Sequence, residues 1–411
     1  MEFKQQQLEN GLQIIGEINP SAKSAAVGFF VKTGSRDETP AISGVSHFLE
    51  HMLFKGTDTL SALEVNAAFD DRGAQFNAFT SEENTVYYAS VLPEYLEKVS
   101  QLWCQLLRPA LRDSDFDMEK NVIKEEIAMY KDMPNFDVMD CCRQLHFDGH
   151  PCGNSVLGTN ESIDALSSQQ MRDYFGQRYA PNNITLAFAG NFQWDRAVAL
   201  AKQYCSTWTP YAVDRQISHV SGSGSQDRTT QVERVCEHIC LMSDGVAYQD
   251  DAYYAALLLS SIIGDQVGSR FFWELVDKAL AEAAHLSLDG MDGTGALVSY
   301  IRCRPDKVAE VLAIVQSILA DVTQQGITED ELRQARNKIL SALVIKNELP
   351  MGRLVDLGFN WTYLRQYRTL EQDVTDIKAV TVDDVNAIAK QLKPDRYSQY
   401  RIGPAQTGTI G

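Results

Sequence analysis

Apolar and polar positions in the first half of the chain predict strands and helices in alternation. Two strand-like runs lie within residues 11–38, and the second, AAVGFFVKTG, is almost entirely apolar, as expected of an inner strand of a sheet. The apolar-periodic stretch VSHFLEHMLF begins after Ser43-Gly44 and stops at Lys55-Gly56, which predicts a helix. Further helices are expected from Ser61 to Asp71, from Leu92 and from about Ser114, and strands over AQFNAFTSEENTVYYASVL and ITLAFAGNF.

The second half of the chain repeats the order of the first. A strand, a helix, two strands, two long helices and a closing strand, YSQYRIGPA, follow a polar stretch rich in Gly and Ser. We therefore predict a domain over 1–212, a linker over 213–228 and a second domain over 229–411, each an α+β unit. The helix DDAYYAALLLSSIIGD of the second half corresponds by order to the helix that contains His47 and His51, but it offers Tyr, Ala, Leu and Ser.

Size and charge narrow the class of protein. A chain of 411 residues exceeds what one core usually organises, and 44% apolar residues suit a packed globule, so two domains are expected. The net charge of -18 argues against binding to nucleic acid or an anionic membrane and favours basic peptides. No signal peptide or membrane-spanning segment is recognised, and the eight cysteines have no disulfide-scaffold density, so the prediction is cytoplasmic.

The residues that carry chemistry lie in the helix before Lys55. His47 and His51 are four residues apart and share one helix face, so their imidazoles can reach one metal ion. Glu50 lies beside them as a candidate general base. A catalytic zinc takes three protein ligands and leaves one position open, so a third ligand must come from elsewhere in the fold. The alternative is that both histidines are structural residues of a buried helix.

These segments resemble a known family. GVSHFLEHMLFKGT resembles the signature of the pitrilysin/insulysin (insulinase-like) zinc metallopeptidases, which are inverzincins, in their two-domain processing-peptidase-like branch. RGAQFNAFTSEENTVYY is similar to a strand of that family, and DFDMEKNVIKEEI to the segment that supplies its third ligand. The resemblance implies two homologous domains, each a mostly antiparallel sheet packed with helices, enclosing a chamber. It also implies one Zn²⁺ per chain and proteolysis.

The resemblance assigns roles to two glutamates of the second long helix. Glu126 corresponds to the zinc ligand and Glu119 to a second-shell residue, and a separation of seven residues places both on one helix face. Glu125 competes for the ligand role, but it lies about 100° around the helix from Glu126.

The resemblance also implies that a short or unfolded peptide binds as an added strand. The edge strand for it bears Phe76, Asn77, Ala78 and Phe79. The same residues would also suit an ordinary core strand.

One part of the family pattern is missing. Relatives carry an Arg and a Tyr seven residues apart in the second domain, and these positions are Val276 and Ala283 here. Neither side chain can donate a hydrogen bond to a substrate carbonyl. A dimer is expected, and a heterodimer with a homologous chain bearing the Arg/Tyr pair is an alternative. A non-catalytic assembly subunit and a metal-dependent hydrolase of another bond are the other hypotheses, although an intact Glu50 argues against the assembly subunit.

Overall fold

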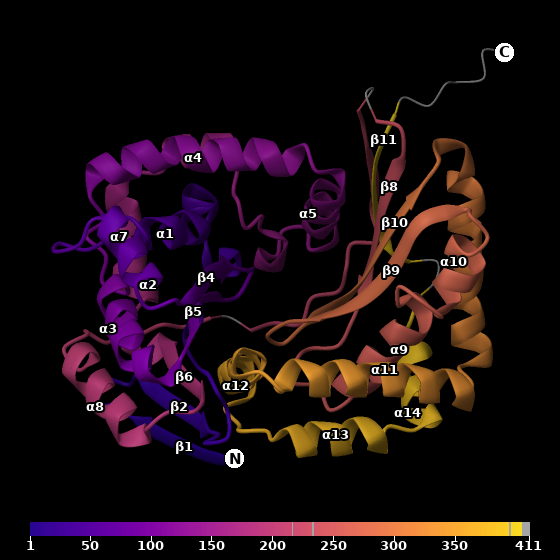
Figure 1. Ribbon diagram of the computed structural model, residues 1–411. Helices are drawn as coiled ribbons and strands as arrows, with labels where there is room; N and C mark the ends of the chain where they lie inside the picture. The colour runs from indigo at the N-terminus through magenta and orange to yellow at the C-terminus, as the bar shows by residue number, and fades with distance from the viewer. Residues whose placement is uncertain (216, 232–233, 394–395, 405–411) are drawn as a thin grey trace. The chain divides into compact units, whose positions relative to one another are not determined.

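The computed structural model describes residues 1–215, 217–231, 234–393 and 396–404. They form two compact units, and each unit takes one segment from the other half of the sequence (Figure 1). Unit 1 comprises Met1–Ala128, Asn154–Gln216 and Leu343–Leu370, and unit 2 comprises Met129–Gly153, Ile217–Ala342 and Glu371–Gly411. Because each unit contains three separate segments of the chain, no single linker divides the two units in sequence. The predicted linker over 213–228 remains a proposal.

Unit 1 is built on a six-stranded sheet. Its strands are β1 (Glu2–Gln7), β2 (Gln13–Ile18), β3 (Ala25–Val31), β4 (Gln75–Thr80), β5 (Thr85–Val91) and β6 (Ile184–Gly190), in the order β1-β2-β6-β3-β5-β4. Among the described strands of this sheet, β2 and β6 are the pair that runs parallel. The strand β3 lies inside the sheet with all seven residues buried, which explains why its sequence, AAVGFFV, shows no polar alternation.

Helices cover both faces of this sheet. The helices of unit 1 are α1 (Val45–Leu53), α2 (Ala62–Asp70), α3 (Leu96–Leu106), α4 (Asp113–Lys131, in unit 1 as far as Ala128), α6 (Asn160–Ala165), α7 (Ser168–Arg178), α8 (Trp194–Cys205) and α12 (Pro350–Leu364). Phe48 of α1 and Trp103 of α3 belong to the main core of the unit. Leu354, Leu357 and Trp361 of α12 pack in a second core with residues of the sheet. The unit thus has a three-layered construction.

Unit 2 repeats this topology. Its strands are β7 (Gln226–Thr230), β8 (Glu237–Asp244), β9 (Ala281–Gly290), β10 (Gly295–Cys303) and β11 (Ser398–Gly403), in the order β7-β11-β8-β10-β9. Again one pair, β7 with β11, is parallel. This order matches β2-β6-β3-β5-β4 of unit 1, strand for strand. The prediction of an α+β fold built from two homologous units is confirmed.

The helices of unit 2 pack on both faces of its sheet. They are α5 (Pro134–His146), α9 (Tyr253–Gly264), α10 (Val308–Gln325), α11 (Glu329–Asn347, in unit 2 as far as Ala342), α13 (Leu370–Ala379) and α14 (Val382–Ala389). Residues of α9, α10 and α14 share the main core, while Val138 and Cys142 of α5 pack in a small core with Cys240, Met242 and Ile402. Within the described ranges, no helix has both the length and the apolar character needed to cross a bilayer.

Candidate metal centre

A buried carboxylate holds the beginning of the helix that bears the two histidines. Glu38 accepts hydrogen bonds from the backbone N–H groups of Gly44 and Ser46, each at 2.7 Å, and so satisfies donors that the first helical turn leaves free. Burial raises the pKa of Glu38 to about 7, although these hydrogen bonds oppose the rise. Gly44 has a φ of +90°, a backbone conformation that is unfavourable for residues other than glycine. The loop that precedes α1 therefore fixes where the helix starts.

The two histidines and one glutamate bring their ligand atoms together. Glu126 Oε2 lies 3.6 Å from His47 Nε2 and 3.3 Å from His51 Nε2. One ligand atom from each of the three residues lies within 4.8 Å of the others. The imidazole rings stand edge to face, with centroids 4.8 Å apart. The spacing of four residues in α1 thus produces the arrangement that it predicts.

The helix α4 presents its two glutamates as their spacing predicts. Glu119 is buried together with Ile123 and Ile127, and Glu126 is half-buried facing the histidines. Glu125 is exposed. Of the two neighbouring candidates for the third ligand, the structure brings Glu126 to the histidines.

Glu119 and Lys55 orient His51 from behind. The Nδ1 atom of His51 lies 3.0 Å from Glu119 Oε1, and Lys55 Nζ forms an ion pair with Glu119 Oε2. Burial alone would lower the pKa of His51, but hydrogen bonds to Glu119 and Glu126 raise it to about 9. Burial likewise opposes the ionised form of Glu119, yet His51 and Lys55 hold its pKa below the ordinary value. A carboxylate in this position fixes the ring orientation and the tautomer that leaves Nε2 free for a metal.

Glu50 is held by a threonine on the neighbouring strand. Thr80 Oγ1 donates a hydrogen bond to Glu50 Oε2 at 2.5 Å. Burial raises the pKa of Glu50, and the bond from Thr80 opposes the rise. The charges of His51 and Glu126 also act on Glu50, so the carboxylate lies within electrostatic reach of the candidate ligands. A raised pKa makes the ionised carboxylate a better proton acceptor, as a general base requires.

The donor set fits zinc. Bonds of about 2.0–2.1 Å in a tetrahedron separate neighbouring ligand atoms by about 3.3–3.4 Å, and the two measured separations to Glu126 are 3.3 and 3.6 Å. Burial lowers the pKa of His47 to about 4, so this imidazole is neutral at pH 7, whereas the pKa of His51 is about 9 and zinc would have to displace a proton from that ring. Two imidazoles and one carboxylate are a known catalytic zinc set that leaves a position open.

The predicted substrate-binding residues lie on an edge strand. β4 is the last strand of its sheet and pairs only with β5 in the described part of the chain. Phe76 stacks on Phe69, with ring centroids 3.9 Å apart, and Ala78 is buried, while Asn77 is exposed. Phe79 packs near Phe359 of α12. The four residues thus combine core side chains with a backbone edge that pairs with no further strand in the described residues, and on it the Ala78 N–H donates to Asn77 Oδ1 at 2.9 Å.

The positions that replace the Arg/Tyr pair lie in unit 2. Val276 ends a short π-helix, Phe272–Val276, and Ala283 lies in β9. β9 is the last strand of its sheet. In register, Ala283 pairs with Arg302 of β10.

Three residues of this centre were not predicted to take part in it. Thr80 lies in the family-like strand sequence, but nothing in the sequence placed it against Glu50. Lys55 was interpreted as the end of the helix. The role of Glu38 depends on the fold of the loop that brings its carboxylate to the N–H group of Gly44, and no sequence pattern predicts that loop conformation.

Comparisons with known proteins agree with this arrangement. Residues 13–160 match the family model described as insulinase (peptidase family M16), and residues 165–339 match the model described as peptidase M16 inactive domain. The chain is 30% identical to a protein named uncharacterized zinc protease YmxG of Bacillus subtilis (strain 168), over 98% of each. It is 33% identical to a protein named uncharacterized zinc protease Rv2782c of Mycobacterium tuberculosis, covering 97% of this chain and 92% of that one.

Solved structures share the fold. A protease from Helicobacter pylori superposes with a TM-score of 0.91 at 20% identity, covering 98% of this chain and 100% of the other. A chain of complex III2 from Candida albicans superposes with a TM-score of 0.84 at 19% identity, covering 98% and 95%. The family models and the full-length relatives show that this chain belongs to the insulinase family, peptidase family M16.

Proposed function

We propose that the chain is a zinc-dependent endopeptidase that hydrolyses short or unfolded peptides bound as an added strand along β4. The observation that carries this proposal is the convergence of His47, His51 and Glu126, with Glu50 beside them on the same helix. A purely structural zinc would not require a carboxylate base next to an open coordination position.

Each residue of the centre has a distinct task. His47, His51 and Glu126 would hold one zinc ion per chain, and Glu119 would keep the His51 ring in place. When bound, zinc supplies Lewis acidity that polarises the scissile carbonyl and makes water a better nucleophile. Glu50 accepts the proton of the attacking water and delivers it to the leaving amine.

The backbone of β4 supplies the substrate site. In the described residues the outer edge of β4 pairs with no further strand, so its backbone groups can bind an extended peptide without reading every side chain; unfolded segments are then accepted and folded proteins are not. The Ala78 N–H donates to Asn77 Oδ1 at 2.9 Å and would exchange this bond for one to the peptide. Phe76 and Ala78 pack against the core of unit 1 and so anchor this strand. The net charge of -18 adds a preference for basic peptides.

A second candidate function follows from Val276 and Ala283. If the Arg/Tyr pair of relatives is required, a homologous chain that bears it would complete the enzyme, and this chain would be the zinc-bearing subunit of a hetero-oligomer.

Cleavage of a panel of quenched peptides by the purified chain with one equivalent of zinc tests both candidates. Activity that is lost with a chelator and in Glu50→Gln, and retained in Glu125→Gln, supports an endopeptidase that needs no partner. Stoichiometric zinc without any cleavage contradicts that proposal and favours the subunit. A Glu125→Gln variant that loses zinc while Glu126→Gln keeps it would overturn the assignment of the third ligand.

A further inference from the structure

The carboxylate of Glu50 has one oxygen engaged by the protein. Its Oε2 atom accepts the hydrogen bond from Thr80 Oγ1 at 2.5 Å, the length of a short hydrogen bond between a hydroxyl and a carboxylate. In the described part of the chain, Thr80 is the hydrogen-bonding partner of Glu50. The contact leaves Oε1 for proton transfer and restricts rotation of the carboxylate.

Thr80 is itself firmly placed at the end of β4. It pairs with Thr85 of β5 across the sheet, and its β-branched side chain has few rotamers. The turn that follows is closed by a hydrogen bond from the Ser81 N–H to the Asn84 carbonyl at 2.8 Å. The hydroxyl of Thr80 therefore approaches Glu50 from a fixed direction.

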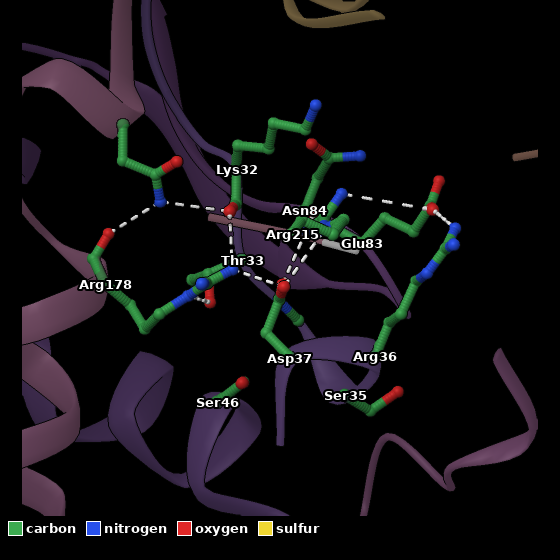
Figure 2. Close-up of polar contacts among 12 residues, drawn as sticks. Lys32, Thr33, Ser35, Arg36, Asp37, Ser46, Glu83, Asn84, Arg178 and Arg215 are labelled. Atoms are coloured by element: carbon green, nitrogen blue, oxygen red, sulfur yellow. Dashed lines mark hydrogen bonds and ion pairs between the residues drawn. The ribbon is translucent and has the colours of Figure 1, made fainter. Parts of the chain in front are cut away.

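Two buried arginines secure this turn. Arg36 donates to the carboxylate of Glu83 at 2.5 Å, and both side chains are only 2% exposed. Arg215 donates to the Glu83 carbonyl at 2.7 Å and to Asp37 at 2.5 Å. Figure 2 shows these side chains converging, with Arg178 also paired to Asp37. Such a network is costly to disrupt, because each charge would remain buried without its partner.

From this geometry, and resting on the proposed function of Glu50, we propose that Thr80 is a positioning residue. Its hydroxyl fixes the orientation of the Glu50 carboxylate, and the Glu83 turn holds Thr80 in place. The edge strand that binds the peptide backbone and the donor that orients the base are then one element, β4. The same strand therefore sets the positions of both the bound peptide and the Glu50 carboxylate.

A different explanation is that the Thr80 hydroxyl only satisfies a buried carboxylate and stabilises the fold. The two roles differ in their kinetics. Loss of orientation lowers kcat with little effect on KM, because substrate is bound by the strand backbone, whereas loss of stability changes the unfolding temperature and the active fraction.

The test compares Thr80→Val, which keeps the branched shape without the hydroxyl, with Thr80→Ser, which keeps the hydroxyl. Thr85→Val is the matched control, since it removes a hydroxyl that donates to the Thr33 carbonyl at 3.0 Å and does not contact Glu50. Zinc content, unfolding temperature, kcat and KM are measured for each variant with the same quenched peptide.

We expect kcat of Thr80→Val to fall at least tenfold, with KM within twofold and full zinc content. Thr80→Ser should recover kcat to within threefold of the wild type, and Thr85→Val should keep it. A Thr80→Val enzyme with kcat within twofold of the wild type would overturn the proposal, as would a Thr80→Ser enzyme as slow as Thr80→Val. A wild type that cleaves no peptide, or that cleaves no faster than Glu50→Gln, would overturn the proposed function and this inference with it.

Discussion

Replacing Glu119 by alanine should weaken zinc binding while the fold stays intact. Glu119 contacts the centre through His51, whose Nδ1 atom lies 3.0 Å from its carboxylate. Without that contact the ring loses both its orientation and the partner that fixes its tautomer. The remaining partner, Lys55, has a side chain that is 31% exposed and stays solvated, so little destabilisation is expected.

The expected loss can be stated as an affinity. Removing the orienting partner of a metal-bound histidine weakens binding about 10- to 100-fold, or about 1.4–2.7 kcal/mol. A second effect opposes it. The pKa of His51 is about 9, so a proton competes with zinc below that pH, and Glu119 is one cause of the raised pKa. The Glu119→Ala variant relieves that competition, so its loss of affinity should be larger at pH 9 than at pH 7.

Competition with a chelating indicator of known zinc affinity measures the effect at both pH values. Glu125→Ala is the control, because it removes an exposed carboxylate from the same helix and leaves His51 untouched. Wild-type affinity in Glu119→Ala at pH 9 would refute the reasoning. So would an equal loss in Glu125→Ala, since the effect would then be one of general charge.

Two further predictions concern stability. Gly358→Ala in α12 should lower the free energy of unfolding by about 1–3 kcal/mol, because the added Cβ would lie 2.1 Å from the ring of Phe30. The control, Gly176→Ala in α7, places its Cβ where no atom lies within 4 Å and should be neutral or stabilising. Chemical denaturation that finds Gly176→Ala less stable than Gly358→Ala would contradict the packing argument. Burial lowers the pKa of His146 to about 4 from 6.5, so its contribution to stability is full above pH 6.5 and is lost as the pH falls to 4, by up to about 3 kcal/mol. In His146→Gln this loss of stability between pH 6.5 and pH 4 should be missing. Curves of the free energy of unfolding against pH that run parallel for the wild type and the variant would contradict the prediction.

Local patterns in the sequence predict much of the fold. The apolar run AAVGFFV identifies a central strand, and the capping box of Ser61 with Glu64 begins α2 where the sequence places it. The strand β7 escapes prediction because its sequence, QDRTT, has no apolar alternation. It forms because β11, near the other end of the chain, pairs with it, and pairing with a distant strand produces no pattern in the local sequence.

The candidate site likewise contains residues that local sequence patterns predict and residues that they do not. His47, His51 and Glu50 follow from helical spacing, and Glu119 and Glu126 from spacing together with the family resemblance. Thr80 could not be predicted, because its contact with Glu50 joins residues 30 apart through a strand and a helix. The charged partners of Glu83 are still more distant in sequence, since Arg36 is 47 residues away and Arg215, in the segment predicted to be a linker, is 132 residues away.

The position of α12 in unit 1 has a consequence for the order of folding during synthesis. Strands β1 to β6 are complete once residue 190 has been made, but Leu354, Leu357 and Trp361, which cover Ile15, Phe30 and Ala187, are made much later. One face of the first sheet therefore stays bare on the ribosome while more than 150 further residues are translated. A nascent chain of this protein should require a chaperone or a temporary cover for that face, and a stop codon shortly before Pro350 should yield an insoluble product although the whole candidate zinc centre is present.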